Sequence, residues 1–99
     1  MQVEQAATGF ASIGSEPRLE VLQTLVRAFP DGLTVGEIQQ RSGLAASTLA
    51  HHLRSLSSAG LIEQSRDGRS VISRARIDQI EALASYLMSE CCADAGRSC

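Results

Sequence analysis

The sequence contains no lysine and no tryptophan, and only three of its 99 residues are aromatic. Arginine therefore supplies all nine of its fixed positive charges. No apolar run approaches the roughly 20 residues that a membrane-spanning helix needs, so we expect no membrane partner. The stretch from Met1 to Gln5 has neither a basic cluster nor a long apolar core. We therefore expect no signal peptide and a cytoplasmic location.

Catalytic signatures are also missing. We find no nucleophile beside a base, no phosphate-binding loop and no acid pair, so an enzyme is the least favoured class and no organic cofactor is expected. Three cysteines are an odd number, which favours free thiols, metal ligation or redox chemistry over a disulfide framework. Repeats and linkers are absent, and residues 1–99 predict a single small domain that would gain stability from oligomerisation.

The net charge of −2 hides a strong internal division. Residues 41–76 contain six arginines against two acidic residues, a local charge of +4, and the rest of the chain has a charge of −6. Phosphate binding depends on the local field, so a basic centre on an acidic body is compatible with nucleic acid. Guanidinium groups also suit paired hydrogen bonds to phosphate or guanine.

Apolar periodicity predicts helices on both sides of this basic centre. Residues 3–12 form a short first helix, and Ser15 begins a second helix that runs to about Ala28. The expected apolar stripe of the second helix contains Leu19, Leu22, Val26 and Phe29. A final amphipathic helix begins near Arg76 and extends over 77–92, followed by a tail at 93–99. Its stripe contains Ile77, Ile80, Leu83, Ala84, Leu87, Met88 and Cys91.

Residues 35–59 predict a helix-turn-helix. Thr34 and Glu37 have the spacing of a capping box, and Gly43 ends that helix with a sharp turn. The next helix runs from about Ala46 to Ala59, and its buried face is expected to contain Leu49, Leu53 and Leu56. A wing at 61–74 follows, with strands at about 61–66 and 69–74 joined by Asp67–Gly68. The fold class is mainly α with a small β wing, ordered ααααββα: a winged helix-turn-helix.

The face of the 46–59 helix opposite its leucines is polar and is expected to contact DNA. It contains Ser47, Thr48, His51, Arg54 and Ser55. His52 lies closer to the core direction, so we expect it to pack against the domain. A zinc site at the adjacent histidines is the alternative, but neighbouring helix positions diverge and no partner lies four residues on.

Two arginines bracket the expected wing turn. Arg66 and Arg69 could enter a minor groove or hold the flanking phosphates. The alternative is that these charges protect an exposed strand edge from aggregation, and both roles are compatible.

These residues resemble the ArsR/SmtB family of metal- and metalloid-responsive repressors, from about Pro17 to the last helix. The resemblance is most specific at Gly43–Leu44, Ser47–Thr48, His51–His52–Leu53, Ala59–Gly60–Leu61–Ile62 and Asp67–Gly68–Arg69. It implies a homodimer through helices 3–12 and 77–92 that binds an inverted-repeat operator in double-stranded DNA. The cysteine pair of one family site, expected in residues 35–42, is absent, and so are the histidines of the last-helix zinc site.

Cys91, Cys92 and Cys99 resemble the family type that binds trivalent arsenic near the carboxyl terminus. Three thiolates suit a soft three-coordinate ion, so As(III), or Sb(III), is the expected inducer. Several alternatives stay open: structural packing of Cys91, a thiol-redox or sulfide-sensing repressor of the same fold, and a protein-interaction domain. Binding by an interaction domain would be insensitive to salt, whereas DNA binding would not.

Overall fold

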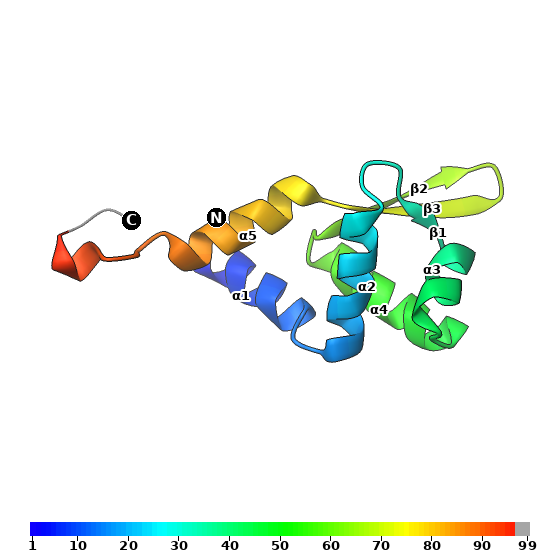
Figure 1. Cartoon of the computed structure of the whole chain (residues 1–99), viewed down its shortest axis with the longest axis horizontal. Coiled ribbons are helices and arrows are strands. Elements are labelled where there is room, and N and C mark those ends of the chain that lie inside the picture. The colour runs from blue at the N-terminus through cyan, green and yellow to red at the C-terminus, as the bar shows by residue number, and fades with distance from the viewer. Residues whose placement is uncertain (97–99) are drawn as a thin grey trace.

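The computed structural model describes residues 1–96, so Cys99 lies outside the described residues. The elements follow in the order α1 (Val3–Ser12), α2 (Glu16–Arg27), β1 (Leu33–Thr34), α3 (Val35–Ser42), α4 (Ala46–Ser58), β2 (Ile62–Asp67), β3 (Ser70–Ala75), α5 (Ile77–Met88) and the 3-10 helix η1 (Ala93–Ala95). Helices α1 and α5 lie together at one end of the molecule, and the β2–β3 hairpin extends at the other (Figure 1). The expected winged helix-turn-helix fold is confirmed.

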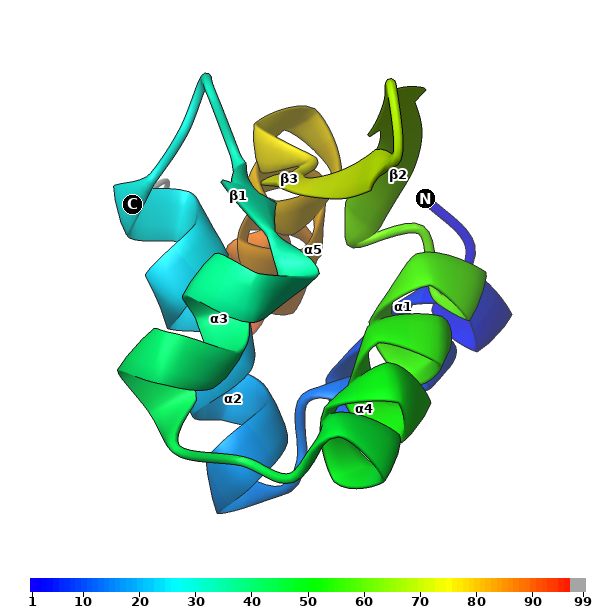
Figure 2. The same cartoon turned by 90° about the vertical axis from the view of Figure 1, so that its right-hand side faces the viewer.

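The core forms where α2, α3 and α4 meet the base of the sheet. Leu25, Ile38, Leu49 and Leu56 are fully buried there. Helix α3 begins with the expected capping box, in which the Thr34 hydroxyl accepts from the Glu37 amide and the Glu37 carboxylate accepts from the Thr34 amide. These hydrogen bonds lower the pKa of Glu37. At its other end, α3 leads through a short turn into α4, as Figure 2 shows.

The sheet has one strand more than the sequence predicted. Its order is β1-β3-β2, all antiparallel, with Leu33 opposite Ser73 and Arg66 opposite Val71. Two residues in β1 are too few to give a periodic pattern, and the pairing with β3 defines the strand. The hairpin strands begin one residue later than expected, so the two-residue loop is Gly68–Arg69. Gly68 adopts a φ of 64°, which a loop glycine tolerates easily.

The apolar stripe expected on α2 was wrong. Val21, Leu22 and Leu25 form its buried face, whereas Leu19, Val26 and Phe29 are 40–51% exposed. The two stripes differ by a rotation of the helix about its axis, and both contain Leu22. Periodicity identified the helix, but it could not decide which of two apolar sides meets α3 and α4.

The last helix ends at Met88, four residues before the expected end. Beyond it, the amides of Ser89, Cys91 and Ala93 each donate to the carbonyl three residues earlier, which is a pattern of successive tight turns. Residues 84, 85 and 87–90 are exposed, so packing does not support continuation of the helix. In the described part of the chain, no helix has the length and apolar character needed to cross a membrane.

The turn before β1 depends on a glycine. Gly32 has a φ of 77°, and a β-carbon there would collide with the carbonyl oxygen of Ser73 and the side chain of Arg74. We expect Gly32→Ala to lower the unfolding free energy by more than about 2 kcal/mol, because the strained φ and the collision add. Gly68→Ala is the matched control, since Gly68 also has a positive φ but open space around it. Urea denaturation measures both; equal losses would contradict this account of the turn.

Candidate nucleic-acid interface and cysteine pair

Helix α4 has one buried side and one exposed polar side. Leu49, Leu53 and Leu56 are at most 3% exposed, and their spacing confines them to one stripe. The opposite side presents Ser47, Thr48, His51 and Arg54, which are all exposed. The helix also begins without a side-chain cap, unlike α2 and α3, so its first amides can donate to an external acceptor.

Ser55 lies at the border of this polar side. It is half-buried, and its carbonyl oxygen accepts a 3.3 Å hydrogen bond from the Ser12 hydroxyl at the end of α1. The residue therefore marks the point where α4 meets α1, and its contact with DNA stays a prediction.

The wing presents its arginines at two places. Side chains alternate along a strand, so Arg66 shares a face with Gln64 and with its cross-strand partner Val71. Arg69 lies in the loop itself, at the tip of the hairpin. Arg74 belongs to the other face, where it donates a 2.7 Å hydrogen bond to the Ser65 hydroxyl. The structure thus separates two exposed arginines that are available to a partner from one that is held by the wing.

A mainly apolar cleft of about 270 Å³ joins α4 to the wing. Arg54 borders it on the α4 side and Gln64 on the β2 side, and its lining also includes Val35, Ala50, Leu53 and Val71. A ligand lying across this cleft would touch the helix and the hairpin together. Sequence reasoning missed Gln64, although its place two residues before Arg66 on a strand puts both on one face.

The interface arginines are not neutralised by nearby carboxylates. Within residues 1–96, the recorded ion pair joins Arg76 to Asp78 at 3.5 Å, and Arg54, Arg66 and Arg69 have no carboxylate within ion-pair distance. Their charges therefore add to the positive potential of this surface, which favours a polyanion.

The other histidine of α4 is part of the interior. His52 is 8% exposed, as expected, and its Nδ1 accepts a 3.3 Å hydrogen bond from Arg18 Nε. Burial and then the positive charges of Arg18 and His51 lower the pKa of His52 from its ordinary value of 6.5. Sequence reasoning placed His52 correctly but missed Arg18, for which the inward direction of His52 was the available signal.

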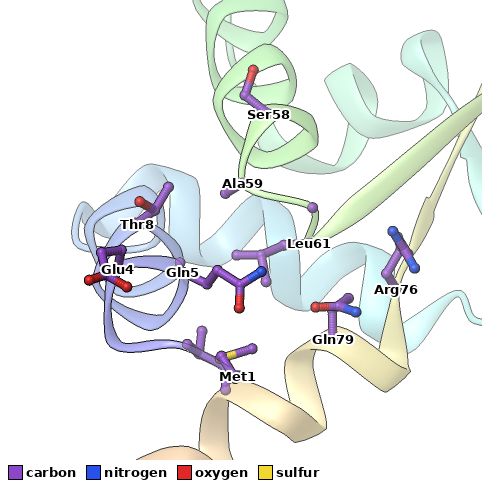
Figure 3. Close-up of a pocket in the computed structure, with 12 residues that line it drawn as sticks. Met1, Glu4, Gln5, Thr8, Ser58, Ala59, Leu61, Arg76 and Gln79 are labelled. Atoms are coloured by element: carbon purple, nitrogen blue, oxygen red, sulfur yellow. The ribbon is translucent and has the colours of Figure 1, made fainter.

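A second pocket separates α5 from the end of α4. It measures about 440 Å³, and Figure 3 shows α1, the α4–β2 turn and α5 around it. Glu4, Gln5 and Thr8 line it from α1, Ser58 and Ala59 from the α4 end, and Arg76 and Gln79 from the start of α5. Because this space intervenes, α5 does not pack closely along the end of α4.

The cysteine pair lies just past α5. Cys91 Sγ and Cys92 Sγ are 3.4 Å apart, close enough for both sulfurs to contact one ion when both are reduced. Cys92 is exposed with a free thiol, and Cys91 is disulfide-bonded. Cys92 has a φ of 63°, so the backbone turns sharply here and the two cysteines are not on a helix as expected. In residues 1–96, no group of three or more potential metal-ligating side chains comes together.

The helix-turn-helix, the exposed polar side of α4 and the basic hairpin beside it define a winged-helix DNA-binding protein. Residues 13–65 match a family model described as a helix-turn-helix domain. The chain is 28% identical to the HTH-type transcriptional regulator YgaV of Escherichia coli over 89 aligned residues. The alignment covers 90% of this chain and 88% of that protein.

Solved structures agree with this assignment. An ArsR-like transcriptional regulator from Rhodococcus sp. RHA1 has a TM-score of 0.79 at 26% identity, covering 95% of this chain and 85% of that one. The homodimeric winged helix-turn-helix domain of Mb0332 from Mycobacterium bovis has a TM-score of 0.70 at 24% identity, covering 90% and 82%. The chain belongs to the helix-turn-helix domain family and is a transcriptional regulator with the ArsR-type winged-helix fold.

The wing arginines are tested through the salt dependence of DNA binding. We expect Arg66→Gln and Arg69→Gln each to weaken binding across all DNA sequences and to reduce the slope of log affinity against log salt by about 1, because one phosphate contact is lost. Fluorescence anisotropy on a duplex selected by the wild-type protein measures the slope. Arg76→Gln is the control, since its guanidinium is paired with Asp78. An unchanged slope in both wing variants would place the phosphate contacts elsewhere.

Proposed function

We propose that this chain is a homodimeric repressor that leaves its operator when trivalent arsenic, or antimony, binds Cys91, Cys92 and Cys99. The observation that carries the proposal is the 3.4 Å separation of Cys91 Sγ and Cys92 Sγ at the end of α5. Soft thiolate ligands suit such ions. Once a cellular thiol reductant has supplied two electrons and two protons to the Cys91 disulfide, the ion displaces the thiol protons as it binds. Cys99, the third ligand, lies outside the described residues and enters on the sequence alone.

The free surface of α1 and α5 supports the homodimer. Val3 is 59% exposed, Leu87 69% and Met88 62%, although all three are apolar. Within one subunit, α1 and α5 pack together, because Gly9 has no side chain and lets α1 approach Leu83 of α5 closely. A second copy packed on α1 and α5 would cover such exposed apolar side chains, and the similar Mb0332 domain is described as homodimeric.

Release would follow from a change in how the two subunits are placed. Two recognition helices must enter successive major grooves about 34 Å apart, so a small rotation between subunits removes one of them from its groove. Binding of one ion at the end of α5 acts on the helix that contributes to this placement. A coupling of about 1–3 kcal/mol would weaken operator binding roughly 5–150-fold.

A thiol-redox or sulfide-sensing repressor is the second candidate. The observation that favours it is that Cys91 is disulfide-bonded while the neighbouring Cys92 is an exposed free thiol. In this mechanism an oxidant accepts two electrons, and two thiols lose their protons as they form a disulfide. Formation of the disulfide would then be the signal, in place of binding of the ion. This chemistry uses the same end of α5 but needs no third ligand.

One experiment separates the two candidates. Operator affinity of the fully reduced protein is measured by fluorescence anisotropy alone, with arsenite, and with the thiol oxidant diamide. We expect arsenite to weaken binding 5–150-fold in the wild type and to leave Cys92→Ser and Cys99→Ser bound. Release by diamide but not by arsenite would overturn the arsenic proposal in favour of the redox one.

Reciprocity provides a second check on the same proposal. If arsenite weakens DNA binding by some factor, operator DNA must weaken arsenite binding by that factor. Calorimetry of arsenite with and without the operator measures it. Equal arsenite affinities in the two titrations would show that the cysteines bind the ion without controlling DNA.

A further inference from the structure

Three helices meet at a small polar junction on the buried side of α4. Arg18 of α2 donates from Nε to His52 Nδ1 at 3.3 Å and from Nη1 to the carbonyl oxygen of Ser12 at 3.1 Å. Ser12, the last residue of α1, donates its hydroxyl to the carbonyl oxygen of Ser55 at 3.3 Å. One guanidinium therefore connects the end of α1 to the middle of α4.

This junction is one connection between α1, which belongs to the proposed dimer interface on which this inference rests, and the recognition helix α4. A pocket of about 440 Å³ lies between α5 and the end of α4, and Figure 3 shows α5 and the α4–β2 turn on opposite sides of it. At its first turn, α5 still meets the chain after α4, where the Arg76 amide donates to the Leu61 carbonyl. Contacts from α1 and α2 remain, and the hydrogen bonds of Arg18 and Ser12 lie among them. Apolar contacts hold the helices together without direction, whereas hydrogen bonds fix the rotation and height of one helix against another.

The hydrogen bond requires an uncharged imidazole. Arg18 Nε can only donate, so His52 Nδ1 must accept, and the ring carries its proton on Nε2. A protonated ring would have no acceptor at Nδ1 and would place two positive charges side by side. The junction would then lose its bond and gain a repulsion.

We propose that Arg18 is a positioning residue, which holds α4 in its DNA-binding orientation relative to α1 by its hydrogen bond to uncharged His52. Operator binding then depends on this bond although neither residue belongs to the polar side of α4. Mild acid breaks the bond and loosens α4 from the helices that set the spacing of the two subunits.

The charges around His52 define the direction of the pH effect. Among the described residues, Arg18 from α2 and His51 on α4 itself act on His52, and both lower its pKa after burial does. The remaining charged side chains on elements packed against α4 are exposed and are not among the groups that shift the pKa of His52. They are Glu16, Glu20 and Arg27 of α2, Glu4 of α1, and Glu63, Arg66 and Asp67 of β2.

The free energy of unfolding also falls when the pH is lowered. The folded protein disfavours protonated His52, so the unfolded chain takes up the proton first as the pH falls below 6.5. The contribution of neutral His52 to stability is fully present above that pH and is lost as the pH falls through the lower, folded-state value. Loosening of the junction therefore begins below neutrality.

The variants separate two properties of His52: its ability to accept a hydrogen bond from Arg18 and its ability to become positively charged. All proteins carry His51→Gln, so that His52 is the single imidazole left in the chain. Asparagine at 52 keeps an acceptor near the position of Nδ1 but does not titrate, whereas leucine removes the acceptor. Arg18→Met removes the donor and keeps an apolar stem of similar length.

Operator affinity is measured by anisotropy from about pH 8 down to the lowest pH at which the parent stays folded, because the pKa of His52 lies below its ordinary value. We expect the parent to lose affinity at least 5-fold on acidification and His52→Asn to bind as the parent does at pH 8 with no loss in acid. We expect His52→Leu, Arg18→Met and the double variant to bind equally weakly at every pH, because all lack the same bond. Urea denaturation at each pH identifies any variant that is simply unfolded.

The distance between α1 and α4 can also be measured without DNA. Nitroxide labels are attached to Ala7→Cys of α1 and Ser47→Cys of α4 in a background with the three native cysteines changed to serine. Dilution with unlabelled protein leaves one labelled subunit in most dimers, so the labels report the distance between the two helices of one subunit. We expect one narrow distribution in the parent and His52→Asn, and a broad one in Arg18→Met and in the parent at low pH. Identical narrow distributions in all four samples, or an Arg18→Met protein with the parent's affinity and pH profile, would overturn the proposal.

Discussion

The burial of Leu49, Leu53 and Leu56 sets the rotation of α4 about its own axis, and the exposed polar side depends on that rotation. If the helix turned by one residue, about 100°, polar side chains would enter the core and leucines would face solvent. Burial of the three leucine side chains contributes several kcal/mol to the free energy of unfolding, whereas one hydrogen bond at the surface contributes about 1 kcal/mol. Packing therefore decides which side chains are offered to DNA, and the polar residues themselves need no stabilising role in the monomer.

The β2–β3 hairpin is attached to the helical core at its base and not at its tip. The Arg76 amide donates to the Leu61 carbonyl at 2.8 Å, which closes the hairpin where it leaves α4 and enters α5. Gln64 Nε2 donates to the hydroxyl of fully buried Ser73, so the two strands are also joined by side chains near the core. Toward the loop, every residue from Glu63 to Ser70 is exposed. A rigid base and an exposed tip suit a hairpin whose arginines must follow the shape of a groove.

The sequence predicted most of the fold because the relevant signals are local. The Thr34–Glu37 capping box, Gly43 and the leucine spacing of α4 each act within a few residues, and the structure confirms all of them. The failures are tertiary. Which apolar side of α2 is buried depends on the position of α3 and α4, and β1 exists only because β3 lies beside it. Helix α5 ends at Met88, where the side chains of residues 87–90 are exposed and the amphipathic pattern no longer reports packing.

The candidate sites differ in the same way. The polar side of α4 could be deduced by rotating a helix away from its leucines, because the outer face of a helix needs no knowledge of other elements. The Arg18–His52 bond joins residues 34 positions apart, and no local pattern predicts such a contact. The cysteine pair was identified by residue type, but its geometry depends on a turn at Cys92 that the helical reading missed.

The position of the cysteines constrains how any signal from them can reach DNA. They follow α5, which lies across a pocket from the end of α4 and meets the chain after α4 at its first turn, where the Arg76 amide donates to the Leu61 carbonyl. Helix α5 does contact α1, where Leu83 packs against Gly9, and α1 ends at Ser12, whose backbone and hydroxyl bond to Arg18 and Ser55. A shift of α5 can thus reach α4 within one subunit through α1. In a dimer built on α1 and α5, the same shift also moves one subunit against the other, so both routes begin at the same helix pair.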